Sequence, residues 1–136
     1  MLNEGGLWPN DTVSYTYANR LRMSLSLASA PWIQRYGYDA ARRLTSITSP
    51  AGEFDYAYDP AQLQRVVALT LPNGAVITNQ YDAVARLTLT ELMNSLGSDL
   101  DSYSYSYNAA NQRTNVVRTA GDYVNYTYDN IGELQT

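Results

Sequence analysis

A tyrosine motif that recurs at near-constant spacing constrains the fold of this chain more than any other feature. Six copies of Tyr-x-Tyr, one reduced to its second tyrosine, are mostly followed by Asp or Asn, and their second tyrosines lie 20 to 26 residues apart. These anchor residues are Tyr15, Tyr17, Tyr36, Tyr38, Asp39, Tyr56, Tyr58, Asp59, Tyr81, Asp82, Tyr105, Tyr107, Asn108, Tyr126, Tyr128 and Asp129. Self-similarity at such a period indicates one supersecondary unit per copy.

Each repeat also contains turn signals between its anchors. Pro presets φ for the second position of a turn, and Gly accepts the positive φ that closes one. The predicted turn residues are Pro50, Gly52, Pro72, Asn73, Gly74, Gly97 and Gly121. One unit is therefore predicted to be a strand, a short turn, a second strand and a second turn.

The anchor is well suited to a β-strand. Residues i and i+2 of a strand share a face, so both tyrosines of one copy are predicted to stand on the same side of a sheet. Stacked copies are expected to make the tyrosines cross-strand or diagonal neighbours. The acid that follows is expected to accept a hydrogen bond from the amide two residues on and to start the turn. Helical periodicity is weak, and only residues 91–100 are predicted as helical or irregular.

These patterns predict an all-β fold, a twisted antiparallel sheet of consecutive β-hairpins with roughly ten to twelve strands. Residues 1–12 are expected to form an N-terminal edge segment. Residues 13–136 are expected to form six hairpin repeats, of which the first is degenerate and the last incomplete.

Composition excludes several classes of function. The chain has no Cys and no His, which removes disulfide frameworks, Cys nucleophiles, His bases and the usual zinc sites. A net charge of −4 without a basic run argues against nucleic-acid binding. No apolar run is long enough to span a bilayer, and no signal peptide is recognisable. We therefore expect no cofactor, no metal and no enzyme.

The pattern Tyr-x-Tyr-Asp-x-x-x-Arg-Leu, followed by a Gly-containing turn and a new Tyr-x-Tyr, resembles the YD repeats of the Rhs family. Toxin-complex shells and teneurins are similar. The resemblance covers roughly residues 13–136 and implies an open segment of an Rhs-like spiral shell. In bacterial relatives such a shell encloses a toxic polypeptide, and in teneurins it supports cell-surface adhesion.

The resemblance implies a non-catalytic structural module that encloses or displays another polypeptide. The alternative is a cell-surface adhesion or carbohydrate-binding module that uses an exposed tyrosine face. The expected partners are other repeats of a longer parent chain or a second copy of this chain, by self-association through sheet edges, and an enclosed toxin polypeptide or a surface glycan. The implied location is extracellular or at the cell surface, as part of a bacterial parent protein.

Two acidic segments are candidate chemical sites. Relatives that release their cargo cut themselves near an Asp-Pro-x-Gly stretch, and Asp59-Pro60 is the one Asp-Pro in the sequence, without the Gly. An ordinary turn explains it better. Asp99 and Asp101 are candidate Ca²⁺ ligands, but the acidic density and spacing favour a solvated loop.

Overall fold

The structure is a computed structural model that describes residues 2–4, 12–28, 32–61 and 64–135, with the backbone alone for 2–4. The described residues contain no helix, and so none that is long and apolar enough to cross a membrane. They form twelve strands: β1 (Leu2–Glu4), β2 (Val13–Ala18), β3 (Leu21–Leu27), β4 (Ile33–Tyr38), β5 (Leu44–Ser49), β6 (Gly52–Tyr58), β7 (Val66–Thr70), β8 (Val76–Tyr81), β9 (Leu87–Met93), β10 (Asp99–Tyr107), β11 (Arg113–Arg118) and β12 (Tyr123–Asn125).

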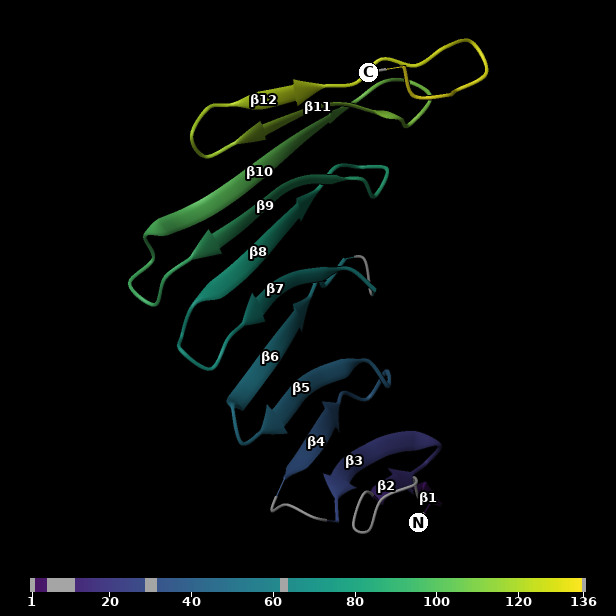
Figure 1. Cartoon of the computed structure of the whole chain (residues 1–136), viewed down its shortest axis with the longest axis vertical. Helices are drawn as coiled ribbons and strands as arrows, with labels where there is room; N and C mark the ends of the chain where they lie inside the picture. The colour runs from purple at the N-terminus through teal and green to yellow at the C-terminus, as the bar shows by residue number, and fades with distance from the viewer. Residues whose placement is uncertain (1, 5–11, 29–31, 62–63, 136) are drawn as a thin grey trace. The chain divides into compact units, whose positions relative to one another are not determined.

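The chain forms two compact units, residues 1–73 and 74–136. The first unit holds β1 to β7 and the second holds β8 to β12 (Figure 1). Within each unit, every strand pairs antiparallel with the strand that follows it. The prediction of an open, all-β arrangement of consecutive hairpins is therefore confirmed. The predicted edge segment, residues 1–12, lies mostly outside the described residues.

The helical alternative for residues 91–100 was wrong, and only the turn at residues 94–98 lies outside the strands. β9 continues to Met93, a turn follows, and β10 begins at Asp99, with Met93 paired to Asp99. The longest repeat carries its extra residues in β10, which has 9 residues, and not in a helix or an irregular loop. The polar residues around the turn hid the period-2 pattern of the two long strands.

The commonest turn is a five-residue turn with a left-handed fourth residue. In the turn from Asp82 to Arg86, the Asp82 amide donates to the Arg86 carbonyl at 3.0 Å, and the Ala85 amide donates to the Asp82 carbonyl at 3.0 Å. The same pair of bonds closes the turns that begin at Asp39, Asn94, Asn108, Arg118 and Asp129. The fourth residues have φ between 63° and 88°: Arg42, Ala85, Asn111, Gly97, Gly121 and Gly132. This geometry is a type I turn closed by a left-handed bulge residue.

The first anchor uses another turn, which explains why it lacks the acid. Ala18 pairs with Leu21, so only Asn19 and Arg20 connect the two strands, with φ of 50° and 67°. Positive φ at both central residues defines the tight turn that matches strand twist, and Asn is favoured there. A two-residue connection has no place for a capping carboxylate.

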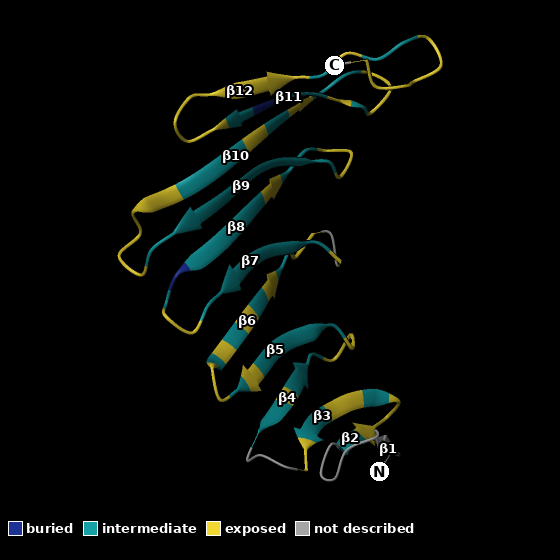
Figure 2. Cartoon of the chain, viewed as in Figure 1, coloured by how far each residue is buried: buried dark blue, intermediate teal, exposed yellow. Residues whose placement is uncertain are grey.

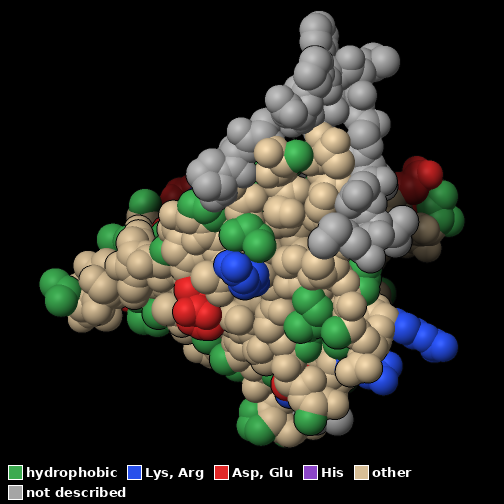
Figure 3. Space-filling view, turned by 90° about the horizontal axis from the view of Figure 1, so that it is seen from below, with side chains coloured by type: hydrophobic (Ala, Val, Ile, Leu, Met, Phe, Trp, Pro, Cys, Tyr) green, Lys and Arg blue, Asp and Glu red, His purple; other side chains and the backbone are tan. Residues whose placement is uncertain are grey.

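Neither unit has a buried core layer in its described part. Ala75 and Val116 are the buried hydrophobic residues there, at 5% and 7% exposure, and most strand residues are half-buried (Figure 2). On the face shown in Figure 3, hydrophobic side chains lie as small separate groups among polar atoms and backbone. The stability of each unit therefore depends on contacts between neighbouring strands.

Matched turns allow a test of the left-handed positions. A non-Gly residue in this region costs about 1–2 kcal/mol, and Gly loses about 0.5–1 kcal/mol of backbone entropy on folding. We expect Ala85→Gly to stabilise the chain and Gly97→Ala to destabilise it, each by about 0.5–1 kcal/mol. A Cβ at Gly97 meets no atom within 4 Å, so strain alone is measured. Urea titration checks this; shifts of the same sign in both variants would contradict it.

Candidate functional site: the joints between repeats

A β-bulge follows the turn in the first five anchor hairpins. Tyr38 lies opposite Leu44 and Gly37 lies opposite Ser46, so Thr45 has no partner in the register. Tyr17, Tyr58, Tyr81 and Tyr107 show the same shift, opposite Arg22, Val66, Leu87 and Arg113. Bulges of this kind bend a strand and locally increase its twist. The bulge therefore redirects the first residues of each return strand.

The tyrosines are not one another's cross-strand neighbours, contrary to the prediction. Anchor strands alternate with return strands, so a direct partner comes from a return strand. Tyr36 lies opposite Ile47, and Tyr56 lies opposite Leu69. Tyr105 lies opposite the buried Val116. The rings therefore pack against aliphatic side chains, a favourable cross-strand combination.

Backbone pairing between consecutive repeats stops before the anchor turns. In the first unit, the last pair between β5 and β6 on this side is Ser46 with Asp55, which leaves the Leu44 carbonyl beyond the paired segment. The Tyr58 hydroxyl donates to that carbonyl at 2.8 Å. A tyrosine side chain thus supplies the hydrogen bond that the neighbouring strand no longer provides.

The same bond recurs at each joint within a unit, where a joint is the boundary between consecutive repeats at the anchor-turn end. The second tyrosines donate to Arg22 at 3.0 Å, Leu44 at 2.8 Å, Leu87 at 2.7 Å and Arg113 at 2.8 Å, from Tyr38, Tyr58, Tyr107 and Tyr128 respectively. Each accepting residue is the first or second residue of a return strand. Each also lies opposite the second tyrosine of the preceding repeat. The tyrosines therefore connect repeat to repeat in series.

The acid after the second tyrosine organises the turn. The Oδ1 atom of Asp82 accepts from the amides of Val84 at 3.0 Å and Arg86 at 2.9 Å. Its Oδ2 atom accepts from Arg86 Nε at 2.6 Å. The Arg86 amide, followed by the guanidinium of the same residue and the Val84 amide, lowers the pKa of Asp82 against the effect of burial. The pKa of Asp39 is lowered in the same way by Arg43.

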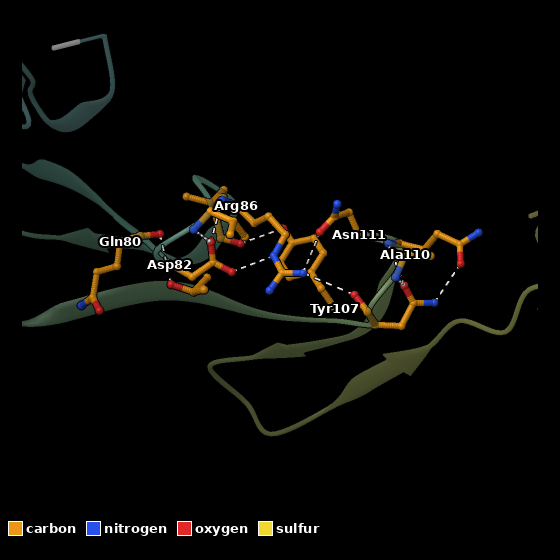
Figure 4. A network of polar contacts seen from close by, with 11 residues as sticks. Gln80, Asp82, Arg86, Tyr107, Ala110 and Asn111 are labelled. Atoms are coloured by element: carbon orange, nitrogen blue, oxygen red, sulfur yellow. Dashed lines mark hydrogen bonds and ion pairs between the residues drawn. The ribbon is translucent and has the colours of Figure 1, made fainter. Parts of the chain in front are cut away.

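The arginine four residues after the acid links its turn to the next repeat. The Arg43 guanidinium lies over the Tyr58 ring at 4.4 Å, and that of Arg86 lies over Tyr107 at 4.9 Å. Arg86 Nη1 also donates to the Asn111 side chain at 3.0 Å and the Asn108 carbonyl at 3.3 Å (Figure 4). Each arginine therefore bridges its own carboxylate and the ring of the following anchor.

The other anchors vary this arrangement. Asn108 keeps the turn through bonds from the Ala110 and Gln112 amides at 3.0 Å, with Gln112 in place of the arginine. Asp129 accepts from the amides of Ile131 and Glu133 at 3.0 and 2.8 Å. Asp59 accepts from the Ala61 amide at 2.8 Å. The backbone role of the acid is thus common to these anchors, and the arginine bridge belongs to two of them.

Sequence reasoning assigned no role to the tyrosine hydroxyls or to the arginines. A signal for the hydroxyl was present, because the chain has 13 Tyr and 1 Phe. Ring packing alone would accept Phe as well as Tyr, whereas a hydrogen-bond donor at each joint requires Tyr. The pairs Asp39–Arg43 and Asp82–Arg86 are visible in the sequence. The ring that each arginine covers in the next repeat depends on sheet register and cannot be read from one repeat.

The two acidic segments that were candidate chemical sites, around Asp59 and Asp101, form local hydrogen bonds. Asp59 caps the turn that contains Pro60, and its amide donates to the Arg65 carbonyl at 2.9 Å. Asp101 accepts from the Ser102 amide at 2.9 Å and the Thr119 hydroxyl at 3.3 Å. Within the described ranges, no group of three or more acidic, His or Cys side chains is placed to hold a metal ion.

Residues 32–53 match the family model of the RHS repeat. This segment contains the anchor Tyr36 to Asp39, the Asp39–Arg43 turn and strand β5. The resemblance to the Rhs family that the sequence indicated is thereby confirmed. A comparison with curated protein sequences finds no match.

Solved structures from toxin complexes have a similar fold. The crystal structures of TcdB2–TccC3–TEV and TcdB2–TccC3–Cdc42 both align with a TM-score of 0.78 and 19% identity, over 93% and 90% of this chain. The Photorhabdus luminescens Tc holotoxin pore with a TccC3 mutation aligns with a TM-score of 0.74 and 20% identity over 90%. This chain spans 6 to 7% of those chains. The likeness shows a shared repeat fold.

Two tyrosines of one anchor offer a matched test of the hydroxyl. We expect Tyr58→Phe to destabilise the chain by about 0.5–1.5 kcal/mol, because the Leu44 carbonyl loses its donor. Tyr56→Phe is the control, since no described residue accepts or donates a hydrogen bond at the Tyr56 hydroxyl. Urea unfolding of both variants measures the difference. Equal midpoints for the two variants would rule out the proposed role of the hydroxyl.

The carboxylates predict acid sensitivity. Because folding lowers the pKa of Asp39 and Asp82 below 3.8, their stabilisation is complete above that value and is lost as the pH falls through the folded-state pKa. Urea midpoints of the parent chain should therefore fall below about pH 4. The double variant Asp39→Asn/Asp82→Asn should show a shallower fall, since Asn108 makes the same backbone bonds. Parallel curves at constant ionic strength would refute the assignment.

Proposed function

We propose that the chain is a non-catalytic structural module, a segment of an Rhs-like β-shell wall that encloses or displays another polypeptide. Within each unit, each repeat joins the next through the same kind of bond, from a tyrosine hydroxyl to a carbonyl. A wall that grows by adding identical units needs such a joint, in which each repeat contacts only its neighbours. This periodic bond is the observation that carries the proposal.

The use of the motif residues supports a structural role. The acids hold turns, the arginines bridge neighbouring repeats, and the second tyrosines bond to carbonyls. Few motif groups therefore remain available for chemistry on a substrate. The match of residues 32–53 to the RHS repeat supports the same assignment.

The proposal includes the division of the chain and its setting. Residues 13–136 act as six consecutive hairpin repeats, and residues 1–12 form an edge segment. The module belongs to a longer bacterial parent protein at the cell surface or outside the cell. Its partners are further repeats of that parent, through the sheet edges, and an enclosed toxin polypeptide.

The alternative, an adhesion or carbohydrate-binding module, requires exposed aromatic faces. Among the anchor tyrosines Tyr17 is 51% exposed and the others are half-buried, and Tyr123, which belongs to no anchor, is 65% exposed. A sugar platform needs several rings on one open surface. The hydroxyls and cations that occupy the joints make the structural role the better supported one.

The exposed edge provides the test. β12 pairs with β11 through only three residue pairs, and Tyr123, Val124 and Asn125 are all exposed. An unprotected edge strand pairs readily with another strand, and a charge there opposes pairing. We expect concentration-dependent association in light scattering, reduced by Val124→Lys. Val84→Lys, on an exposed turn, is the control and should leave it unchanged.

Three results would count against a wall segment. A strictly monomeric chain that binds sugars on a glycan array would support the adhesion module. Equal association of the parent chain and Val124→Lys would exclude this edge. A shortened product on incubation, absent in Asp59→Ala, would show self-cleavage.

A further inference from the structure

The second unit contains a groove at the joint between its last two anchors. Its volume is about 350 Å³, and it is lined by Tyr107, Asn111, Arg113, Tyr126, Tyr128 and Leu134. At the preceding joint of this unit the Arg86 guanidinium lies over Tyr107 and bonds to the turn beyond it. The two joints therefore differ in one pair of side chains, Asp82 and Arg86 at the preceding joint and Asn108 and Gln112 at this one.

Gln112 occupies the position that Arg86 holds one repeat earlier. Its Oε1 atom accepts from Asn108 Nδ2 at 2.8 Å, and its Nε2 atom reaches the Gly132 carbonyl only at 3.5 Å. No guanidinium covers the Tyr128 ring in the described part of the chain. The shorter, neutral side chain therefore leaves open the space that an arginine closes elsewhere.

A second joint without the acid and arginine pair supports this explanation. The first anchor has the two-residue turn at Asn19 and Arg20, and a groove of about 310 Å³ lies between that turn and Tyr38, Asp39 and Arg42. Each unit thus has a groove at a joint that lacks the acid and arginine pair. The groove near Asp39 contains charges of both signs, so it favours no single class of ligand.

The groove of the second unit has one sign of charge. Arg113 is its one charged lining residue. The Arg113 guanidinium stacks on the Tyr105 ring at 4.6 Å and forms no ion pair with a described residue. The nearby Asp129 accepts from two amides of its own turn and does not line the groove. A carboxylate is the complementary ligand group.

We propose that this groove binds an acidic side chain, next to an aromatic residue, of another polypeptide. The carboxylate pairs with Arg113, the Asn111 side chain offers a hydrogen bond, and the neighbouring ring packs against Tyr126, Tyr128 and Leu134. The Tyr107 and Tyr128 hydroxyls already donate to carbonyls. They are therefore poorly placed to serve the many hydroxyls of a sugar, which favours a peptide.

This inference rests on the proposed function in that the occupant is a displayed or enclosed polypeptide. The test uses the whole chain and the peptide acetyl-Tyr-Glu-amide, with acetyl-Tyr-Gln-amide as the uncharged probe. Amide chemical shifts of Asn111 and Gly132 report on the groove in an NMR titration. We expect binding of the acidic peptide to be about two- to fivefold tighter than that of the amide peptide, the range of an exposed ion pair.

Two variants locate the binding. Arg113→Gln should remove the preference for the acidic peptide and leave weak binding of both. Asn108→Asp/Gln112→Arg should restore the pair found at Asp82 and Arg86, fill the groove and abolish the titration shifts. Urea unfolding of both variants verifies that they are folded.

Equal binding of the two peptides, unchanged binding by the filled variant, or stronger binding of glucuronate than of the acidic peptide would each overturn the proposal. These outcomes are separate from the test of the wall segment. Association through β12 requires no residue that lines the groove.

Discussion

One interaction joins the repeats of each unit where their strands separate, the donation of a tyrosine hydroxyl to a carbonyl of the preceding repeat. Backbone pairing between repeats ends before the anchor turn, at Ser46 with Asp55 in the first unit and Leu89 with Ser104 in the second. A carbonyl left without a donor in a half-buried position is unfavourable. Tyr58 and Tyr107 reach these carbonyls from the neighbouring repeat, so the sheet stays joined where the strands separate.

The acid and the arginine hold the tyrosine ring at two of these joints. Arg86 holds the ring of Tyr107 from one side, and its own position is fixed by Asp82, which is fixed in turn by two backbone amides. The spacing of four residues between acid and arginine is therefore the spacing of a turn. The spacing of about twenty residues between anchors is that of one hairpin.

The sequence predicted the elements better than their connections. The strands and the hairpin order follow from tyrosine spacing and from Gly and Pro signals, which act locally. Residues 91–100 were mispredicted because polar residues in two long strands masked their alternation. The aliphatic partners of Tyr36 and Tyr56 depend on register, which a bulge shifts by one residue and which no single repeat encodes. The groove beside Arg113 depends on Gln112, and its importance appears only by comparison with Arg86.

In a repeat sheet without a buried core layer, a substitution changes stability mainly at the joint where it lies. When stability is a sum of units and nearest-neighbour contacts, a weak joint lowers the local free energy of opening without unfolding the rest. Gln112 weakens one contact of this kind, since it reaches the next repeat only through the 3.5 Å hydrogen bond to the Gly132 carbonyl, where Arg86 forms a charged bridge. The same substitution exposes Tyr128 and Arg113 to a ligand. Asn108 and Gln112, in place of the acid and arginine pair, thus give this joint a surface with a chemical preference, while the turn bonds and the tyrosine bond of the repeat are retained.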